Sequence, residues 1–204
     1  MTGYTQINLQ DLLNEAGEDR TKSILSNFYC PLNADVEDFL KHKAMQFSIQ
    51  GLSKTYLVFA SYKDNPVLVG YYTLAMKYFH ISKNALSYNL RKRINKFAQY
   101  DNSIKKHIVT APLIAQLGKN FNNTYNKLIT GDELLKIACD KISEIQSSIG
   151  SKIAYLECED KECLKAFYES NGFVNFGKRL LDRDETEKMD GKYLIQMLRY
   201  FDGN

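Results

Sequence analysis

Apolar residues near the start of the chain recur at helical spacing. Within residues 36–51 the apolar positions lie three or four residues apart: Val36, Phe39, Leu40, Ala44 and Phe47. This spacing places them on one face, so the pattern predicts an amphipathic helix that ends near Gly51. Residues 54–81 are instead rich in β-branched and aromatic residues on either side of Asp64-Asn65-Pro66. They predict a β-hairpin.

The remaining chain continues to alternate between helical and strand patterns. A surface helix is predicted by apolar residues at helical spacing, with Lys and Arg on the other faces: Leu86, Leu90, Ile94 and Phe97. The mostly apolar residues 107–120 predict a strand in the interior of the sheet. A long helix is predicted for residues 131–150, which carry acids in the first turn. The last elements predicted are a strand at 152–159, a helix at 161–170, and strands at 173–181 and 191–201 around a polar turn at 182–190.

This order of elements predicts the fold class. Strands and helices are interleaved without a repeat, a low-complexity tract or a Pro/Gly-rich linker. The pattern indicates one α/β (α+β) domain over residues 1–204, with a mixed, mostly antiparallel sheet flanked by helices. A chain of this length buries about 70% of the surface that its unfolded form exposes, so it needs no disulfide or metal to stabilise a core.

Composition narrows the classes of function. The four cysteines show no CxxC spacing and the three histidines are far apart, so we expect no metal site and reduced, cytoplasmic thiols. The chain has no run of about 18 apolar residues that would span a membrane. The net charge of +3 does not by itself require a nucleic-acid partner. However, residues 91–106 hold six Lys or Arg against one Asp.

The closing half of the chain carries a recognisable motif. Strand, loop, long helix and strand are followed by a short helix that ends in AFYESNGF, residues 166–173. This order resembles the GNAT acyl-CoA N-acetyltransferases. FYCPLNADVEDFLKHKA, which begins at Phe28, and the hairpin after it resemble the toxin-type branch of that family. The resemblance covers about residues 28–80 and 108–200, and it leaves a basic helical insertion at about 82–106.

The resemblance implies a reaction and a catalytic residue. It implies transfer of an acetyl group from acetyl-CoA to a primary amine, with Tyr168 of the FYxxxGF motif as the general acid that protonates the departing thiolate. The alternative is that Tyr168 only packs the helix on the sheet. Glu157 and Glu159 lie on the preceding strand, and we expect Glu157 to accept the amine proton through water. A strand-end glutamate that is simply solvated is the alternative.

The resemblance also implies where acetyl-CoA binds. Main-chain groups at a strand end would contact the pantetheine and the thioester, and a turn before the long helix would hold the diphosphate. The residues that match are Ala115, Gln116, Leu117 and Gly118 for the strand end, and Asn126, Lys127, Leu128, Ile129, Thr130 and Gly131 for the turn. Ile129 stands where the family has glycine. Since a β-branched residue disfavours positive φ, either φ stays negative there or the loop is rearranged.

The acceptor is left open by the sequence. The toxin-type resemblance implies the α-amine of an aminoacyl-tRNA, and we expect Arg91, Arg93 and Lys96 to bind its RNA. The alternative for this segment is a solvated helix face. Other acceptors that remain are a small molecule or a protein, and a catalytically impaired CoA-binding or interaction module is a further alternative. An antitoxin partner and a homodimer are left open as well.

Overall fold

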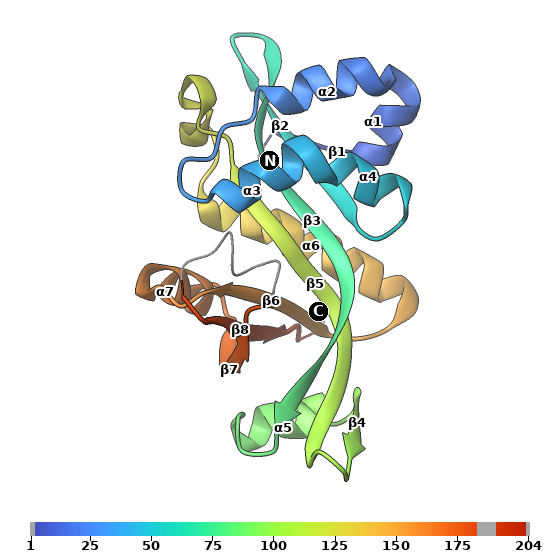
Figure 1. Cartoon of the computed structure of the whole chain (residues 1–204), viewed down its shortest axis with the longest axis vertical. Helices are drawn as coiled ribbons and strands as arrows, with labels where there is room; N and C mark the ends of the chain where they lie inside the picture. Colours follow the sequence, from blue (N-terminus) through green and yellow to red (C-terminus); the bar gives the residue numbers. More distant parts are fainter. Residues whose placement is uncertain (1–2, 183–190, 203–204) are drawn as a thin grey trace. The chain divides into compact units, whose positions relative to one another are not determined.

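Strands and helices alternate along the residues that the computed structural model describes, 3–182 and 191–202 (Figure 1). The strands are β1 (Tyr4–Asn8), β2 (Lys54–Tyr62), β3 (Asn65–Ser82), β4 (Ala98–Asp101), β5 (Lys106–Lys119), β6 (Ile153–Glu159), β7 (Val174–Leu180) and β8 (Tyr193–Tyr200). The helices are α1 (Leu9–Ala16), α2 (Glu18–Ser26), α3 (Ala34–Asp38), the π-helical η1 (Phe39–Lys43), α4 (Ala44–Ile49), α5 (Tyr88–Ile94), the 3₁₀ segment η2 (Asn122–Lys127), α6 (Gly131–Ile149) and α7 (Glu162–Ser170). Within the described residues no helix is long and apolar enough to cross a membrane.

The strands form one eight-stranded sheet in the order β1-β2-β3-β5-β6-β8-β7, with β4 paired to β5. β1–β2, β2–β3, β4–β5, β6–β8 and β7–β8 are antiparallel, whereas β5 and β6 are parallel. β5 lies inside this order, as its apolar sequence predicted. The predicted mixed, mostly antiparallel sheet with helices is confirmed.

The chain divides into two compact units, which are described separately. The first unit comprises Met1–Ala75 and Ala115–Ala138, and the second comprises Met76–Ile114 and Cys139–Asn204. Long strands β3 and β5 contribute residues to both units. The organisation of residues 1–204 as a single domain stays a prediction.

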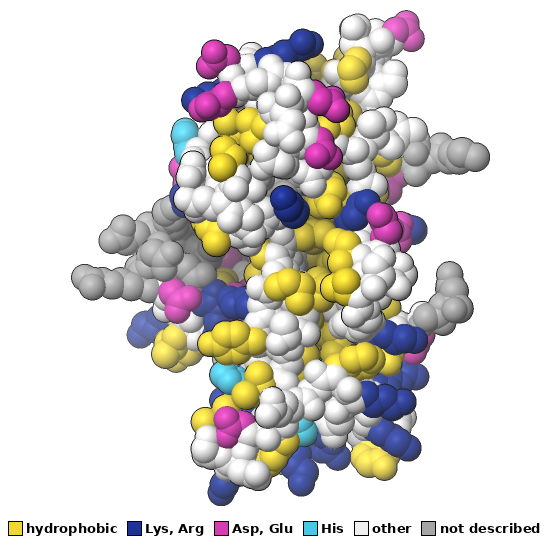
Figure 2. All heavy atoms as spheres, turned by 90° about the vertical axis from the view of Figure 1, so that its right-hand side faces the viewer, with side chains coloured by type: hydrophobic (Ala, Val, Ile, Leu, Met, Phe, Trp, Pro, Cys, Tyr) yellow, Lys and Arg dark blue, Asp and Glu magenta, His cyan; other side chains and the backbone are white. Residues whose placement is uncertain are grey.

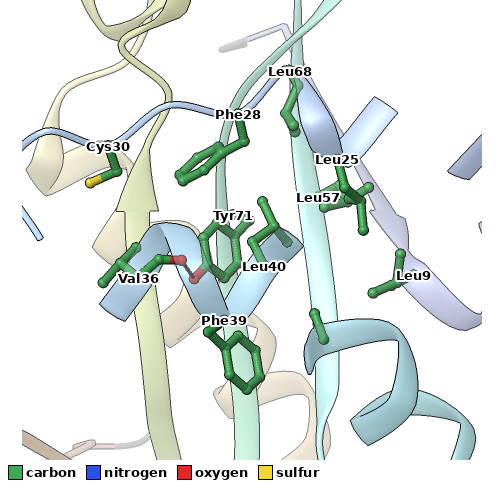
Figure 3. Close-up of a cluster of buried hydrophobic side chains, with 11 residues drawn as sticks. Leu9, Leu25, Phe28, Cys30, Val36, Phe39, Leu40, Leu57, Leu68 and Tyr71 are labelled. Atoms are coloured by element: carbon green, nitrogen blue, oxygen red, sulfur yellow. Dashed lines mark hydrogen bonds between the residues drawn. The ribbon is translucent and has the colours of Figure 1, made fainter. Parts of the chain in front are cut away.

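The core of the first unit is built around Tyr71 of β3 (Figure 3). Its ring is fully buried, and its hydroxyl donates a hydrogen bond to the Val36 carbonyl oxygen at 2.5 Å. The ring of Phe28 packs edge-on against it, with the ring centroids 5.1 Å apart. The predicted helix over 36–51 is thus present as the run α3, η1 and α4, and it supplies Val36, Phe39, Leu40 and Ala44 to this core.

The core of the second unit is an aromatic stack. The rings of Phe79 on β3 and Tyr155 on β6 lie 4.1 Å apart and nearly parallel. Leu86, just before α5, and Ile94, its last residue, belong to the same buried cluster. The predicted amphipathic helix therefore forms, but it is shorter than predicted: Leu86 and Phe97 lie outside α5, although both pack on this core.

Three parts of the structure differ from the sequence prediction or lie beyond it. The elements β1, α1, α2, β4 and η2 were not predicted, and β4 falls within the segment predicted as a basic helical insertion. The hairpin turn is made by Lys63 and Asp64, which have φ values of 50° and 61°, whereas Asn65 and Pro66 already belong to β3. Residues 183–190, most of the predicted polar turn, lie outside the described residues.

Replacement of Gly118 by alanine is expected to destabilise the first unit. A Cβ atom at Gly118 would lie 2.4 Å from Val36 Cγ1 and 3.2 Å from Phe28 Cζ. Val36 is stiff at χ1 and its carbonyl group is bound by Tyr71, so relief requires movement of packed groups. We expect Gly118→Ala to lower the free energy of unfolding by about 1–3 kcal/mol in urea titrations. Gly3→Ala is the control, because its Cβ would meet open space. Equal midpoints for the two variants would contradict this packing.

Candidate active site

Tyr168 is set at the end of α7 by the residues that follow it. Gly172 has a φ of 80° and its N–H donates to the Glu169 carbonyl oxygen at 2.9 Å, while the Phe173 N–H donates to the Tyr168 carbonyl oxygen at 3.0 Å. These are the two bonds of a Schellman motif, which needs a left-handed residue such as glycine. The buried Phe173 then packs its ring 6.0 Å from that of Tyr168. The Asn-Gly-Phe sequence is therefore a helix stop that orients the tyrosine.

The surroundings of Tyr168 keep its phenol protonated. The residue as a whole retains some exposure, but burial of the phenol raises its pKa, and the neighbouring Cys158 of β6 adds to the shift. Within residues 3–182 and 191–202 no hydrogen bond engages the hydroxyl. A neutral phenol without a competing acceptor is suited to donate a proton.

Glu157 of β6 is held in a network of charges and hydrogen bonds. Arg179 Nε donates to Oε1 at 2.7 Å and Arg179 Nη2 donates to Oε2 at 2.6 Å, so the pair is bidentate. Lys77 Nζ donates to Oε2 at 3.1 Å, and the hydroxyl of Tyr155 donates to Oε1. Gln196 Nε2 in turn donates to the Tyr155 hydroxyl at 2.7 Å.

The network holds Glu157 ionised. Burial alone would raise the pKa of this carboxyl, whose side chain is only 8% exposed, but the hydrogen bonds from Arg179 and Tyr155 and the positive charges of Lys77 and Arg179 outweigh burial and lower it. A carboxylate with a lowered pKa is a weak base. The arrangement favours a charge-holding role over proton abstraction.

Tyr168 and Glu157 lie at opposite faces of β6. Successive residues of a strand point to opposite faces, so Cys158, beside Tyr168, and Glu157 face different sides. Both residues belong to the second unit. The candidate acid and the charged network are therefore arranged around one strand.

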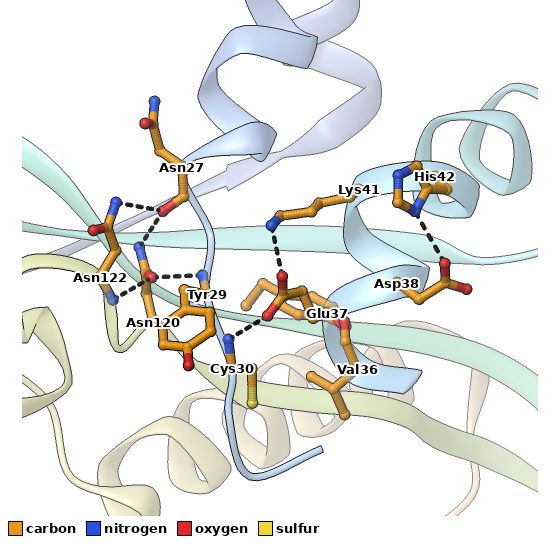
Figure 4. A network of polar contacts seen from close by, with 11 residues as sticks. Asn27, Tyr29, Cys30, Val36, Glu37, Asp38, Lys41, His42, Asn120 and Asn122 are labelled. Carbon is orange, nitrogen blue, oxygen red and sulfur yellow. Dashed lines mark hydrogen bonds and ion pairs between the residues drawn. The ribbon is translucent and has the colours of Figure 1, made fainter. Parts of the chain in front are cut away.

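The strand end predicted for the cofactor, residues 115–118, belongs to the first unit and is fixed by polar contacts. Gln116 Nε2 donates to Asp35 Oδ2 at 3.1 Å. Just beyond, the side-chain oxygen of the buried Asn120 accepts the Tyr29 N–H at 3.0 Å (Figure 4). Its amide nitrogen donates to the Leu68 carbonyl oxygen at 2.9 Å. These bonds tie the end of β5 to β3 and to the segment after α2.

A hollow lies beside this network. It has a volume of about 500 Å³ and is lined by Tyr29, Cys30, Pro31, Ala34, Glu37, Asp38, Lys41 and His42. At its wall Glu37 accepts the Cys30 N–H at 2.8 Å and pairs with Lys41 at 2.6 Å (Figure 4). These contacts brace the segment before α3 against the helix.

The turn predicted to hold the diphosphate, residues 126–131, runs from the end of η2 to the first residue of α6. Ile129 is 2% exposed and is not among the residues with positive φ, so the backbone stays in its ordinary region and the side chain joins the core. Thr130 caps the helix: its hydroxyl accepts the Glu133 N–H at 3.1 Å, and Glu133 accepts the Thr130 N–H at 2.8 Å. This is a capping box. It uses the amide and the hydroxyl of Thr130, whereas Lys127 remains exposed.

The predicted RNA-binding residues lie on or beside α5 in the second unit. Figure 2 shows Lys and Arg side chains gathered at the end of the molecule that carries α5 and β4. Arg91 donates to the Lys83 carbonyl oxygen at 2.9 Å, and Arg93 pairs with Asp202 at 2.6 Å. Lys96 is exposed just after the helix. The residues around this segment include exposed aromatic side chains: Tyr78, Tyr88 and Tyr100.

Sequence reasoning missed three participants, namely Lys77, Arg179 and Asn120. The sequence held a signal for Lys77, because strand alternation places it on the same face as Phe79, which is buried. Such a lysine needs a carboxylate partner. No comparable signal marked Asn120.

Within residues 3–182 and 191–202 no group of three or more His, Cys, Asp or Glu is placed to hold a metal ion.

Removal of the Glu157 charge is expected to destabilise the protein in a pH-dependent way. Glu157→Gln leaves the cations of Lys77 and Arg179 without their counter-charge, so we expect a loss of about 3–5 kcal/mol near neutral pH. Because the folded-state pKa lies below the ordinary 4.5, the contribution is complete above 4.5 and is lost as the pH falls through the lowered value. Urea midpoints of wild type and variant should therefore converge in acid.

The exposed pair of Glu144 and Lys141 provides the control. Glu144 is 69% exposed, so Glu144→Gln should change the midpoint little at any pH. A gap between wild type and Glu157→Gln that stays constant down to the lowest pH at which the protein folds would show that ionisation of Glu157 is not its source.

Comparison with solved structures identifies proteins of the same fold. No family model matches the chain, and no curated protein does. A structure of AtaT complexed with acetyl-methionyl-tRNAfMet is similar at 16% identity and a TM-score of 0.62, over 95% of this chain and 93% of that one. A phenylalanine-for-tyrosine mutant of KacT is similar at 17% identity and a TM-score of 0.59, over 95% and 94% of the two chains. AtaTR bound with acetyl-CoA is similar at 16% identity and a TM-score of 0.54, over 96% and 93%. The chain therefore has the fold of AtaT and KacT, which are toxin-type GNAT acetyltransferases, as its closing motif predicted.

Proposed function

We propose that the chain transfers an acetyl group from acetyl-CoA to the α-amine of an aminoacyl-tRNA. The observation that carries the proposal is the fold shared, over 95% of the chain, with AtaT in complex with acetyl-methionyl-tRNAfMet. A related structure of the same fold holds acetyl-CoA. The proposal also draws on the neutral phenol of Tyr168 as the proton donor and on the basic segment of α5 as the surface for the RNA.

The proposed reaction begins with a neutral amine. Its lone pair attacks the carbonyl carbon of the thioester, and a tetrahedral intermediate forms. The C–S bond then breaks, the sulfur takes a proton from the Tyr168 hydroxyl, and the amine nitrogen loses its proton to water. The raised pKa of Tyr168 keeps the donor protonated before this step. Solvent returns a proton to the phenolate afterwards.

The acceptor chemistry agrees with the low basicity of Glu157. An α-amine has a pKa near ~8, so a useful fraction is neutral at the pH of the cytoplasm. Glu157 is committed to Arg179 and Lys77, and its pKa is lowered. We therefore assign proton acceptance to water, and we assign to Glu157 the task of holding the cations.

Acetyl-CoA is proposed to bind with its diphosphate at the start of α6. The N-terminus of a helix favours anions, and Lys127 is exposed beside it. The capping box of Thr130 and Glu133 occupies some of the donors there. Binding of the diphosphate would therefore depend on Lys127 and on main-chain groups of the turn. The pantetheine would lie along residues 115–118.

Three alternatives or additions to the proposed function concern the acceptor, the binding of CoA and a protein partner. A small-molecule or protein acceptor would leave the basic segment of α5 as a solvated face. An interaction module that does not bind CoA is the alternative that the acids in the first turn of α6 favour, since they repel phosphate. A toxin-like role adds an antitoxin partner, because AtaT has been solved with the C-terminus of the antitoxin AtaR. A cytoplasmic location and a homodimer belong to the same proposal.

Replacement of Tyr168 by phenylalanine tests the general acid. The change keeps the ring and its packing on Phe173 and removes the proton donor, so we expect turnover to fall by roughly 10²-fold or more. Acetyl-CoA should still raise the melting temperature of the variant as it does for the wild type. Tyr62→Phe, at an exposed tyrosine of the first unit, is the matched control. Wild-type rates in Tyr168→Phe would leave the tyrosine with a packing role only.

Reversal of the charges on α5 tests the acceptor. Because cations that contact phosphates release counterions, binding of aminoacyl-tRNA should weaken steeply as salt rises. Replacing Arg91, Arg93 and Lys96 by Glu should weaken RNA binding and leave acetyl-CoA binding unchanged. The control replaces Lys22, Lys54 and Lys63 by Glu, which changes the net charge equally at other exposed positions. Equal RNA binding by the two triple variants would identify the α5 segment as a solvated face.

A further inference from the structure

Lys77, Glu157 and Arg179 form a charge cluster that the proposed proton transfer does not use. It contains two cations and one carboxylate, and the side chains of Arg179 and Glu157 are 19% and 8% exposed. Asp182 lies 3.5 Å from Arg179 Nη1, but its side chain is 74% exposed and solvent screens its charge. Lys77, Arg179 and Glu157 taken together carry a net positive charge.

Lys77 has donor capacity that the protein does not fill. An ammonium group has three N–H donors. One of them bonds Glu157 Oε2 at 3.1 Å, and within residues 3–182 and 191–202 the structure gives no other hydrogen bond to Lys77. The side chain is 35% exposed. The carboxylate thus holds the ammonium in one place while its remaining donors can reach a ligand.

The position of Lys77 connects the cluster to the basic segment of α5. Lys77 and Phe79 share one face of β3, and Phe79 is packed in the same cluster as Leu86 and Ile94, which flank and end α5. Lys77 precedes Phe79 by two residues, about 7 Å along the strand. Lys77 therefore lies on the side of β3 that α5 covers.

We infer that Lys77, held by Glu157, binds a phosphate group at the nucleotide end of the acceptor and so places its amine. The inference rests on the proposed function. A lysine ammonium is a point charge suited to a phosphate, and the Glu157 carboxylate keeps it from adopting other rotamers. Arg179 is bidentate to the same carboxylate and keeps that anchor in position. Lys77 is then a specificity-determining residue for acceptors that carry a phosphate.

The experiment compares two small acceptors that differ by one phosphate. Acetyl transfer is measured to an aminoacyl-adenosine and to the corresponding aminoacyl-adenosine 5′-monophosphate. With the wild type, the phosphate should lower KM by roughly 10-fold, as one charge-assisted hydrogen bond does, and should leave kcat similar. Lys77→Met should abolish this difference, and Lys77→Arg should retain part of it. Because Arg179 still neutralises Glu157 in these variants, the fold should persist, and melting temperatures check it.

Controls separate this inference from the proposed function. Lys178→Met removes an exposed lysine of β7 that pairs with Asp160, and it should keep the full phosphate effect. Lys77→Gln, which retains a hydrogen-bond donor toward Glu157, replaces Lys77→Met if the latter does not fold. Equal KM values for the two acceptors in the wild type, or an undiminished phosphate effect in Lys77→Met, would overturn the role of Lys77 and leave the proposed function standing. Absence of transfer to aminoacyl-tRNA itself would overturn the proposed function, and this inference with it.

Discussion

The buried carboxylate of Glu157 is the constraint on which the arrangement of the second unit depends. A charge that loses its water must be paired, and the partners of Glu157 come from three strands: Lys77 from β3, Tyr155 from β6 itself and Arg179 from β7. The Tyr155 ring also stacks on Phe79 in the apolar core. One side chain therefore joins the core to the charged network. A slip in strand register would leave both cations and the carboxylate without partners, so the network specifies a single pairing.

The two faces of β6 differ in their electrostatic surroundings. On one face Cys158 adjoins Tyr168, whose orientation depends on the helix stop made by Gly172 and Phe173. On the other face the network keeps Glu157 ionised and Lys77 fixed. A proton donor must be neutral and a site for an anion must be cationic. Placing them on opposite faces of one strand lets each have its own electrostatic surroundings.

The turn before α6 is held in place without the glycine that the sequence resemblance implied. Ile129 replaces the expected glycine, and its side chain fills the core at 2% exposure while φ stays negative. Glu133 caps the helix through Thr130. The backbone is thus held by a buried apolar side chain and a capping box. Any contact with a diphosphate must therefore come from the remaining main-chain groups and from Lys127.

The sequence by itself determined the order of the main elements from residue 36 onward, the mixed sheet and the motif that holds Tyr168. These depend on local periodicity, turn chemistry and a helix stop, which are properties of neighbouring residues. The sequence did not predict β1, α1 and α2, because these short segments show no strong periodic pattern. Only the tertiary structure decided that Glu157 pairs with Lys77 and Arg179 and that Asn120 joins β5 to β3. Those partners are 80, 22 and 52 residues apart in the chain, and their meeting depends on how the strands are ordered in the sheet.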